Sequence, residues 1–367
     1  FILIGQVKII LGDSTGAIKI LKKALEISDN KDEIYYQIGL AYQADKKFKK
    51  ASKYFKKAIE CNLNHENALY DLAYCLEITG ELKNSIEYYK KFIDEDPYSE
   101  YAWFNLGNIY MKLDQFENAV EAFEFSIAID EEYSSAYINI SEALIKLEKF
   151  DQAKKYLERS LSLDGPSPEI YSCLGNVNFY LEDYSTSISF YQKSIKIDQM
   201  FKESYFGLGR SLSKLDKWFE AIHFFKKAYK IDNKNIEYVK SLAYAEFKVG
   251  NLVSSIDLYS KAVEMQPDDY KLSLDFSLIY YESGDIDKAI DIIDHAIEES
   301  PGESLLYYRL VIYLMDAGRY KESINVLESA LSLNFDNHDV LFDFVPNFES
   351  QSALIRVINQ FKNSGNR

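Results

Sequence analysis

Residues 103–126 read WFNLGNIYMKLDQFENAVEAFEFS. Large apolar and small side chains recur in this stretch at steps of three and four residues, as in Ala119, Phe123 and Ser126. These steps place the side chains on one face of an α-helix. Asp114 lies between two such runs, where a turn residue is expected. The stretch therefore predicts two helices joined by a short turn.

The second of these helices recurs every 34 residues without an insertion. The column of small residues that contains Ala119 reads Ala17, Ala51, Ser85, Ala119, Ala153, Ser187, Ala221, Ser255, Ala289, Ser323. Four residues later every side chain is large and apolar: Leu21, Phe55, Tyr89, Phe123, Leu157, Tyr191, Phe225, Tyr259, Ile293, Leu327. Internal repeats of this length indicate a stacked repeat architecture.

The first helix has its own column of mostly small residues, twelve positions upstream. It reads Gly5, Gly39, Ala73, Gly107, Ser141, Gly175, Gly209, Ala243, Ser277, Val311. Small side chains there let two helix axes approach closely. The turn between the helices is marked by Gly12, Gly80, Gly250, Gly284 and Gly318, or by Asp114 and Asp216, which are typical C-cap residues. We expect ten helix–turn–helix hairpins and no β-sheet.

These residues resemble the tetratricopeptide repeat (TPR). Trp103, Leu106, Gly107, Tyr110, Ala119 and Phe123 follow its pattern most fully. Departures from it include Lys8, Asn178 and Glu246 at the place of the tyrosine. The resemblance implies an all-α fold, a right-handed α-solenoid of tandem hairpins, over residues 1–337.

Residues 338–367 differ from the repeats and predict a C-terminal capping segment with a frayed tail. Pro346 breaks a first helix early, and Asn347 is expected to cap a final helix that carries Leu354, Ile358 and Phe361. A solenoid needs such an element to cover its last apolar face. Because the first repeat begins at its opening aromatic residue, Phe1, we expect the natural chain to extend upstream.

Composition limits the classes of partner and the compartment. The net charge of −16 disfavours nucleic acid and anionic membranes as main partners. No apolar run approaches the ~20 residues that span a bilayer, so direct membrane insertion is not expected. Three scattered cysteines favour a reducing compartment, which makes a cytoplasmic location the expectation, with a removed targeting segment left open.

The sequence does not predict an enzyme. Its four histidines lie in different repeats, and no metal-binding or nucleophile motif is found. Gly207 and Gly209 sit in a helix rather than in a phosphate-binding loop, because Gly209 belongs to the small column. We expect no catalytic residues, no cofactor and no metal.

The resemblance implies that the first helices line a concave groove. Candidate partner-binding residues on that face are Tyr36, Tyr70, Tyr74, Phe104, Asn108, Met111, Asn176, Phe179, Phe206, Arg210, Tyr244, Phe247, Tyr281 and Tyr308. Exposed aromatic and methionine side chains suit peptide anchors. The alternative is that these rings pack against the neighbouring hairpin and never reach solvent.

Two ligand classes of the family do not fit this groove. A clamp for chaperone tails needs Lys one turn before Asn, but Phe104 precedes Asn108 and Ser172 precedes Asn176. A continuous asparagine ladder is absent as well, since the fitting residues are Asn105 and Asn139. Binding of chaperone tails is therefore not expected.

The leading hypothesis is a non-catalytic scaffold that binds a partner protein or peptide in this groove. Residues 251–350 hold 20 acidic and 6 basic side chains, a net charge of −14, so the partner is expected to be basic where it faces them. Two alternatives stay open. The chain is a structural subunit of an envelope, secretion or other assembly, or it is the recognition arm of a larger enzyme.

Overall fold

A computed structural model describes residues 1–344 and 352–364 of the chain. Every regular element in that part is an α-helix or a short 3₁₀-helix, and none is a strand. The predicted all-α array of helix–turn–helix hairpins is therefore confirmed. The helices form two compact units, Phe1–Asp183 and Tyr184–Arg367, which we call the N-terminal and the C-terminal unit.

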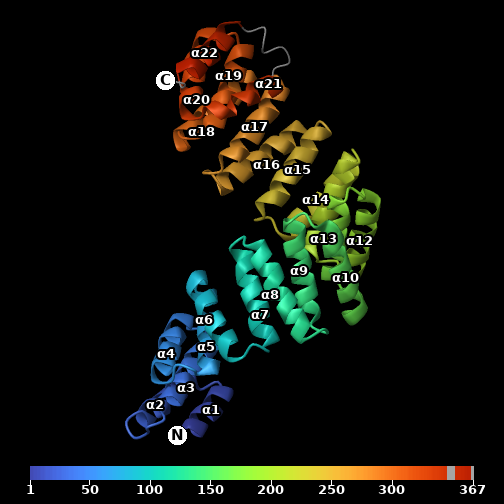
Figure 1. The fold of residues 1–367 in the computed structure, drawn as a ribbon. Coiled ribbons are helices and arrows are strands. Elements are labelled where there is room, and N and C mark those ends of the chain that lie inside the picture. The colour runs from blue at the N-terminus through green and yellow to red at the C-terminus, as the bar shows by residue number, and fades with distance from the viewer. Residues whose placement is uncertain (345–351, 365–367) are drawn as a thin grey trace. The chain divides into compact units, whose positions relative to one another are not determined.

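In the N-terminal unit, the first helices of successive hairpins are α1 (Ile2–Ile10), α3 (Lys31–Ala44), α5 (Glu66–Ile78), α7 (Glu100–Lys112), α9 (Ser134–Lys146) and α11 (Pro168–Tyr180). The second helices are α2 (Ser14–Ala24), α4 (Phe48–Cys61), α6 (Leu82–Glu95), α8 (Phe116–Ile129) and α10 (Phe150–Asp164). In the five hairpins that lie wholly in this unit, from α1–α2 to α9–α10, the two helices lie side by side and are joined by a short turn (Figure 1).

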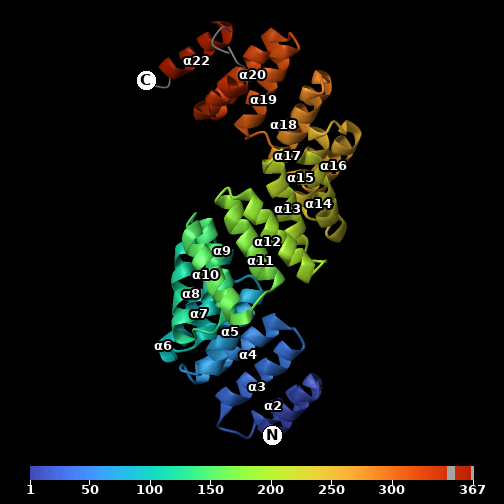
Figure 2. The same cartoon turned by 90° about the vertical axis from the view of Figure 1, so that its right-hand side faces the viewer.

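The C-terminal unit begins with α12 (Tyr184–Ile197), the second helix of the sixth hairpin. Its further first helices are α13 (Lys202–Lys214), α15 (Ile236–Lys248), α17 (Tyr270–Glu282) and α19 (Ser304–Asp316). Its further second helices are α14 (Trp218–Ile231), α16 (Leu252–Met265), α18 (Ile286–Glu299) and α20 (Tyr320–Leu333). Figure 2 shows these hairpins stacked in chain order.

A capping segment follows the tenth hairpin. It consists of the 3₁₀-helix η1 (Phe335–Asp339), α21 (Val340–Phe344) and α22 (Ser352–Ser364), and α22 packs against α20. Leu354 and Ile358 of α22 are buried in the same apolar cluster as the tenth hairpin, and Phe361 packs against that cluster. The expected breaker Pro346 and cap Asn347 lie outside the described residues. The cap buries apolar surface that the last repeat would otherwise expose.

The small columns are the places where helices meet. Ala119 is fully buried. Gly107 of α7 faces the Phe123 ring of α8 so closely that a Cβ at position 107 would lie 2.5 Å from Phe123 Cε1. A small residue in one helix and a ring in the next thus form one interlocking contact, which repeats along the chain because the columns do.

The turns inside the hairpins confirm the predicted C-cap positions. The residues that stand at this place of the repeat all have a positive φ, and they are Gly12, Lys46, Gly80, Asp114, Glu148, Glu182, Asp216, Gly250, Gly284 and Gly318. The left-handed conformation is easy for glycine but costs other residues about 1–2 kcal/mol. Lys46, with φ of 55°, therefore carries backbone strain.

Lys46→Gly is expected to raise the free energy of unfolding of the N-terminal unit by about 0.5–1 kcal/mol, because relief of the left-handed strain exceeds the added chain entropy of glycine. The matched control is Lys53→Gly on the exposed surface of α4, which should cost about 1 kcal/mol. Urea unfolding of both variants checks the prediction. A loss of stability in Lys46→Gly as large as in the control would contradict it.

Candidate functional site

The face formed by the first helices is tied together by hydrogen bonds between successive repeats. We call it the first-helix surface. The Tyr36 hydroxyl of α3 donates to Asp71 Oδ2 of α5 over 2.9 Å. Asn105 Nδ2 of α7 donates to the Tyr70 hydroxyl of α5 over 2.8 Å. Each bond joins one residue to the position 35 further along the chain, so the same contact recurs in the stack.

Two further pairs with the same separation lie two helical turns further along the first helices, one pair in each unit. Lys112 Nζ of α7 is 2.6 Å from Glu77 Oε1 of α5. The Tyr281 hydroxyl of α17 donates to the carboxylate of Asp316 at the end of α19. These cross-repeat contacts fix the spacing of neighbouring first helices, and they preorganise the surface that a ligand would meet.

In the N-terminal unit, four of the five predicted aromatic residues are half-buried: Tyr36, Tyr70, Tyr74 and Phe104. The Tyr36 ring lies 4.9 Å from the His65 ring, and the Phe104 ring lies 4.9 Å from the Tyr133 ring. Tyr74 is also half-buried and contacts the Phe48 ring edge-on. These rings pack against the neighbouring hairpin and still present part of their area to solvent, so the alternative that they never reach solvent is wrong for them, and their contact with a partner stays a prediction.

The other predicted residues of this unit differ in exposure. Asn108 accepts a hydrogen bond from Asn139 Nδ2 over 2.7 Å, and Met111 and Asn176 are half-buried. Phe179 is buried, with 8 % of its surface exposed. Of the predicted residues of this unit, Phe179 is therefore the one that the first-helix surface does not present to solvent, whereas Asn176 on the same helix α11 is partly accessible.

Asp71 is an acidic residue of this part of the surface whose carboxyl group is partly buried. It accepts hydrogen bonds from Tyr36 and, over 3.4 Å, from Gln43 Nε2. Burial raises the pKa of the Asp71 carboxyl above its ordinary value, although both hydrogen bonds oppose the shift. The pKa of Tyr36 is raised by its own burial and by the negative charge of Asp71. Both shifts favour the protonated form of the side chain concerned, the carboxylic acid of Asp71 and the phenol of Tyr36.

The stability of Asp71→Asn relative to wild type is expected to increase as pH rises from the ordinary aspartate pKa of about 4 through the raised folded-state pKa of Asp71. Because the folded-state pKa lies above the unfolded-state value, the folded wild-type protein binds more protons between the two values, and its stability falls as pH rises through that window. The amide cannot ionise and escapes this loss.

Urea unfolding of wild type and variant at several pH values measures this difference. Asp94→Asn, which changes an exposed carboxylate on α6, is the control for the substitution itself. A difference that does not change with pH for Asp71→Asn would show that its ionisation costs the fold nothing.

In the C-terminal unit the first-helix surface holds a cavity of about 580 Å³. Its lining comes from five helices and consists of Arg210, Ser213, Lys214, Trp218, Phe225, Lys240, Ser241, Tyr244, Tyr259 and Asp275. Two of these, Arg210 and Tyr244, were predicted from the sequence. A volume of this size is typical of ligand pockets.

The cavity combines aromatic walls with positive charge. The Trp218 and Tyr244 rings meet edge-on, with their centroids 5.6 Å apart, and Tyr244 is 37 % exposed. Arg210 lies over the Phe206 ring at 5.8 Å. Lys240 Nζ is 3.1 Å from Asp275 Oδ2. Burial opposes the charge of Lys240, but Asp275 outweighs burial and raises the pKa of this lysine.

The repeat explains why this cavity exists. The residues four repeats earlier, in the N-terminal unit, are Tyr74 for Arg210, Phe104 for Lys240 and Asn108 for Tyr244. There the Phe104 ring packs at 5.7 Å from the Phe123 ring. A lysine that turns toward Asp275 does not fill this space, so the same position of the fold becomes a hollow. Lys240 stands in the same column of the repeat as Phe104, and this loss of a ring is the sequence signal that would have indicated the cavity.

The remaining predicted residues of this unit lie on either side of the cavity. Phe206 is half-buried, with its ring 4.8 Å from the Tyr238 ring, and Phe247 and Tyr281 are half-buried too. Tyr308 is fully buried, and its hydroxyl donates to the carbonyl oxygen of Asn334 over 2.8 Å. Tyr308 is thus a core residue that joins the tenth hairpin to the capping segment, and it is unavailable to a partner.

Two kinds of reactive group are relevant among the described residues, metal-binding clusters and nucleophilic thiols. No group of three or more histidine, cysteine or acidic side chains there could hold a metal ion. Cys75 and Cys173 are buried, and burial raises the pKa of Cys75 to about 12 and that of Cys173 further still. Such thiols stay protonated at neutral pH and are poor nucleophiles.

No described helix is both long and apolar enough to cross a membrane.

Comparison with protein families gives matches along most of the chain. Models described as tetratricopeptide repeat match residues 1–31, 36–100, 100–133, 134–166, 202–235, 246–311 and 305–337. These matches include the Asp71 region and four of the five helices that line the cavity, whereas residues 236–245 of α15, which carry Lys240, Ser241 and Tyr244, lie between two matched ranges. No curated protein sequence matches the chain significantly.

Several solved structures resemble parts of the chain. A thermophilic TPR protein from Thermus thermophilus has 16 % identity and a TM-score of 0.46, over 50 % of this chain and 100 % of its own. PilF of Pseudomonas aeruginosa has 20 % identity and a TM-score of 0.47, over 57 % and 96 %. YrrB, described as a TPR protein with an unusual peptide-binding site, has 20 % identity and a TM-score of 0.37, over 51 % and 95 %.

Proposed function

Because the chain belongs to the tetratricopeptide-repeat family, in which helical hairpins serve to bind other proteins, we propose that it is a non-catalytic scaffold that holds a partner peptide on its first-helix surface. The observation that carries this proposal is the cavity between α13, α15 and α17, where Arg210, Lys240 and Tyr244 converge. Arginine and tyrosine are enriched among the residues that dominate binding energy at protein interfaces.

The charge of the C-terminal unit indicates the chemistry of the peptide. Arg210, Lys214 and Lys240 make the α13–α15 end of the surface basic. Glu282 and Asp316 are exposed at the ends of α17 and α19, in the stretch that carries a net charge of −14. A complementary peptide therefore has an acidic residue for the cavity and a basic segment over α17 and α19.

A cavity with aromatic walls gives this peptide an anchor. The exposed Tyr244 ring and the Trp218 ring offer contact area that is already fixed by their mutual packing, so that little entropy is lost on binding. The flanking charges then determine which part of the peptide lies over the cavity and which part lies over α17 and α19. Candidate residues of the N-terminal unit, such as Tyr36 and Phe104, extend the same kind of half-exposed aromatic surface there.

The test is selection of binding peptides from a random library on the full chain. We expect enriched peptides to carry an acidic residue next to a basic segment, in either order, and to lose binding when Arg210 and Tyr244 are both changed to alanine. Enriched peptides that bind this variant as well as wild type would overturn the proposal.

A further inference from the structure

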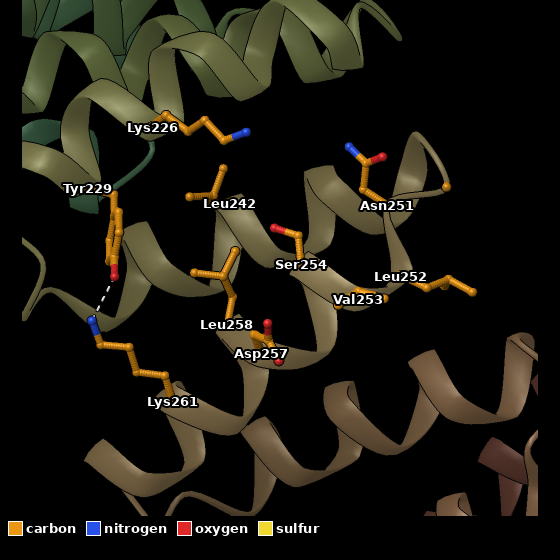
Figure 3. Close-up of a pocket in the computed structure, with 11 residues that line it drawn as sticks. Lys226, Tyr229, Leu242, Asn251, Leu252, Val253, Ser254, Asp257, Leu258 and Lys261 are labelled. Carbon is orange, nitrogen blue, oxygen red and sulfur yellow. Dashed lines mark hydrogen bonds between the residues drawn. The ribbon is translucent and has the colours of Figure 1, made fainter.

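A second cavity of the C-terminal unit lies on the opposite side of the hairpins, between the second helices α14 and α16. Its volume is about 860 Å³. Figure 3 shows Lys226 and Tyr229 reaching into it from α14 and Lys261 from α16, with Leu242 and Leu258 between them. The cavity thus has an apolar floor and two ammonium groups at its sides, and it shares no lining residue with the first-helix cavity.

The equivalent place in the N-terminal unit is smaller because it is filled with rings. That cavity, between α6 and α8, measures about 430 Å³ and is lined by Trp103, Tyr110 and Phe125. The Trp103 and Phe125 rings are stacked with their centroids 4.4 Å apart. The indole Nε1 of Trp103 donates to the carbonyl oxygen of Pro97 over 3.0 Å, which holds the stack in place.

Four repeats later all three rings are missing. Val239 stands for Trp103, Glu246 for Tyr110 and Lys261 for Phe125. Tyr229 stands in place of Ile93, and Leu258 stands in place of Ala122. These larger side chains fill part of the space that the three rings leave. The wider cavity therefore lacks the three aromatic side chains that line the equivalent place in the N-terminal unit.

The charged groups around the cavity are held in place. Lys261 Nζ donates to the Tyr229 hydroxyl over 2.7 Å and lies over that ring at 4.9 Å. Lys226 Nζ is 2.6 Å from Glu246 Oε1, and Asn251 Nδ2 donates to Glu246 Oε2 over 2.6 Å. Glu246 itself is 1 % exposed.

The protonation state of Glu246 follows from these contacts. Burial alone would raise its pKa, but Lys226 and Asn251 lower it below the ordinary value, so this carboxylate is ionised and anchors Lys226. Each ammonium group has three protons, and the contacts named here use one of them. Asp257 is exposed on α16 and adds a negative charge at the mouth.

We propose that this second-helix cavity binds an aromatic side chain of a partner polypeptide with an acidic residue next to it. The ring takes the space that Trp103 and Phe125 fill in the N-terminal unit, above Leu242 and Leu258. Lys226 and Lys261 stack on the ring and bind the neighbouring carboxylate. This site is independent of the first-helix surface and gives the scaffold a second point of attachment on its other side.

Three blocked dipeptides serve as probes on the full chain. They are N-acetyl-glutamyl-tryptophan amide, its glutaminyl analogue without the charge, and N-acetyl-glutamyl-alanine amide without the ring. Binding is followed by the methyl resonances of Leu242 and Leu258. We expect the first probe to bind most tightly, with loss of the ring weakening binding about tenfold or more and loss of the charge weakening it several-fold at low salt.

Two variants locate the site. Ser254→Trp fills the cavity and should abolish binding, whereas Asn118→Trp, the same change four repeats earlier, should leave it intact. Lys261→Met keeps the side-chain stem and should retain the ring preference but lose most of the charge preference. Melting temperatures establish that each variant is folded.

Equal binding of the tryptophan and alanine probes overturns the proposal, as does full binding by folded Ser254→Trp. If Ser254→Trp does not fold, Lys261→Met decides, and an unchanged charge preference in that variant overturns the assignment. The Arg210→Ala/Tyr244→Ala variant should bind all three probes as wild type does, so failure of the first-helix proposal and failure of this one are distinguishable.

Discussion

Phe123→Ala is expected to lower the free energy of unfolding of the N-terminal unit by about 3–5 kcal/mol, the usual cost of deleting a buried aromatic ring. Phe123 has no exposed surface, and its ring fills the space above Gly107, where no side chain can replace it. The ring also packs at 5.7 Å from Phe104. Its loss leaves a cavity at the contact between α7 and α8.

The same truncation at a less buried place of α8 is the control. Phe125 is 47 % exposed and stacks on Trp103, so Phe125→Ala should cost about 1 kcal/mol. Because each repeat contacts its neighbours alone, hydrogen exchange should accelerate around α7 and α8 and stay unchanged in the C-terminal unit. Equal losses for the two variants would contradict the assignment of Phe123 to the contact between the helices.

Arg210→Ala/Tyr244→Ala is expected to weaken binding of a selected peptide by about 2–4 kcal/mol, which is roughly 30-fold to 1000-fold. The double change removes a guanidinium group and an exposed ring from one cavity while the helices keep their buried contacts. Affinity is measured by calorimetry after circular dichroism has established intact helicity. Association of wild type should also slow as salt rises, because exposed charges are screened beyond about 8 Å at physiological ionic strength.

A matched control removes the same two residue types elsewhere. Arg159 and Tyr98 are both exposed and lie in the N-terminal unit, outside the predicted first-helix set. Arg159→Ala/Tyr98→Ala should leave the affinity of the same peptide within about twofold. An equal loss of affinity in both double variants would indicate a general effect of charge or area rather than a cavity at α13–α15.

The sequence predicts the repeats well because the contacts that build them are local in the repeat. Ala119 and Phe123 are one helical turn apart, and Gly107 meets them within the same hairpin, so a single column pattern encodes the packing. The left-handed turns follow in the same way. Even at Lys46, Glu148 and Glu182, where no glycine indicates it, the position in the repeat determines the conformation.

The candidate site is less predictable because exposure depends on neighbours from other repeats. Phe104 and Tyr308 occupy the same repeat position, yet Phe104 is half-buried and Tyr308 is covered completely at the junction with the capping segment. Neither cavity could be predicted from one helix. Each arises from substitutions on several helices, such as Lys240 for Phe104 or Lys261 for Phe125, whose effect appears when the repeats are compared place by place.

The most direct test of peptide binding on the first-helix surface is photo-crosslinking of a selected peptide to the full chain. The photoreactive residue p-benzoylphenylalanine is placed either at Ser213 or Ser241, which line the first-helix cavity, or at Lys227 or Lys230, which are exposed on α14. We predict crosslinks from positions 213 and 241 and none from positions 227 and 230. Crosslinks from the α14 positions alone would contradict binding on the first-helix surface.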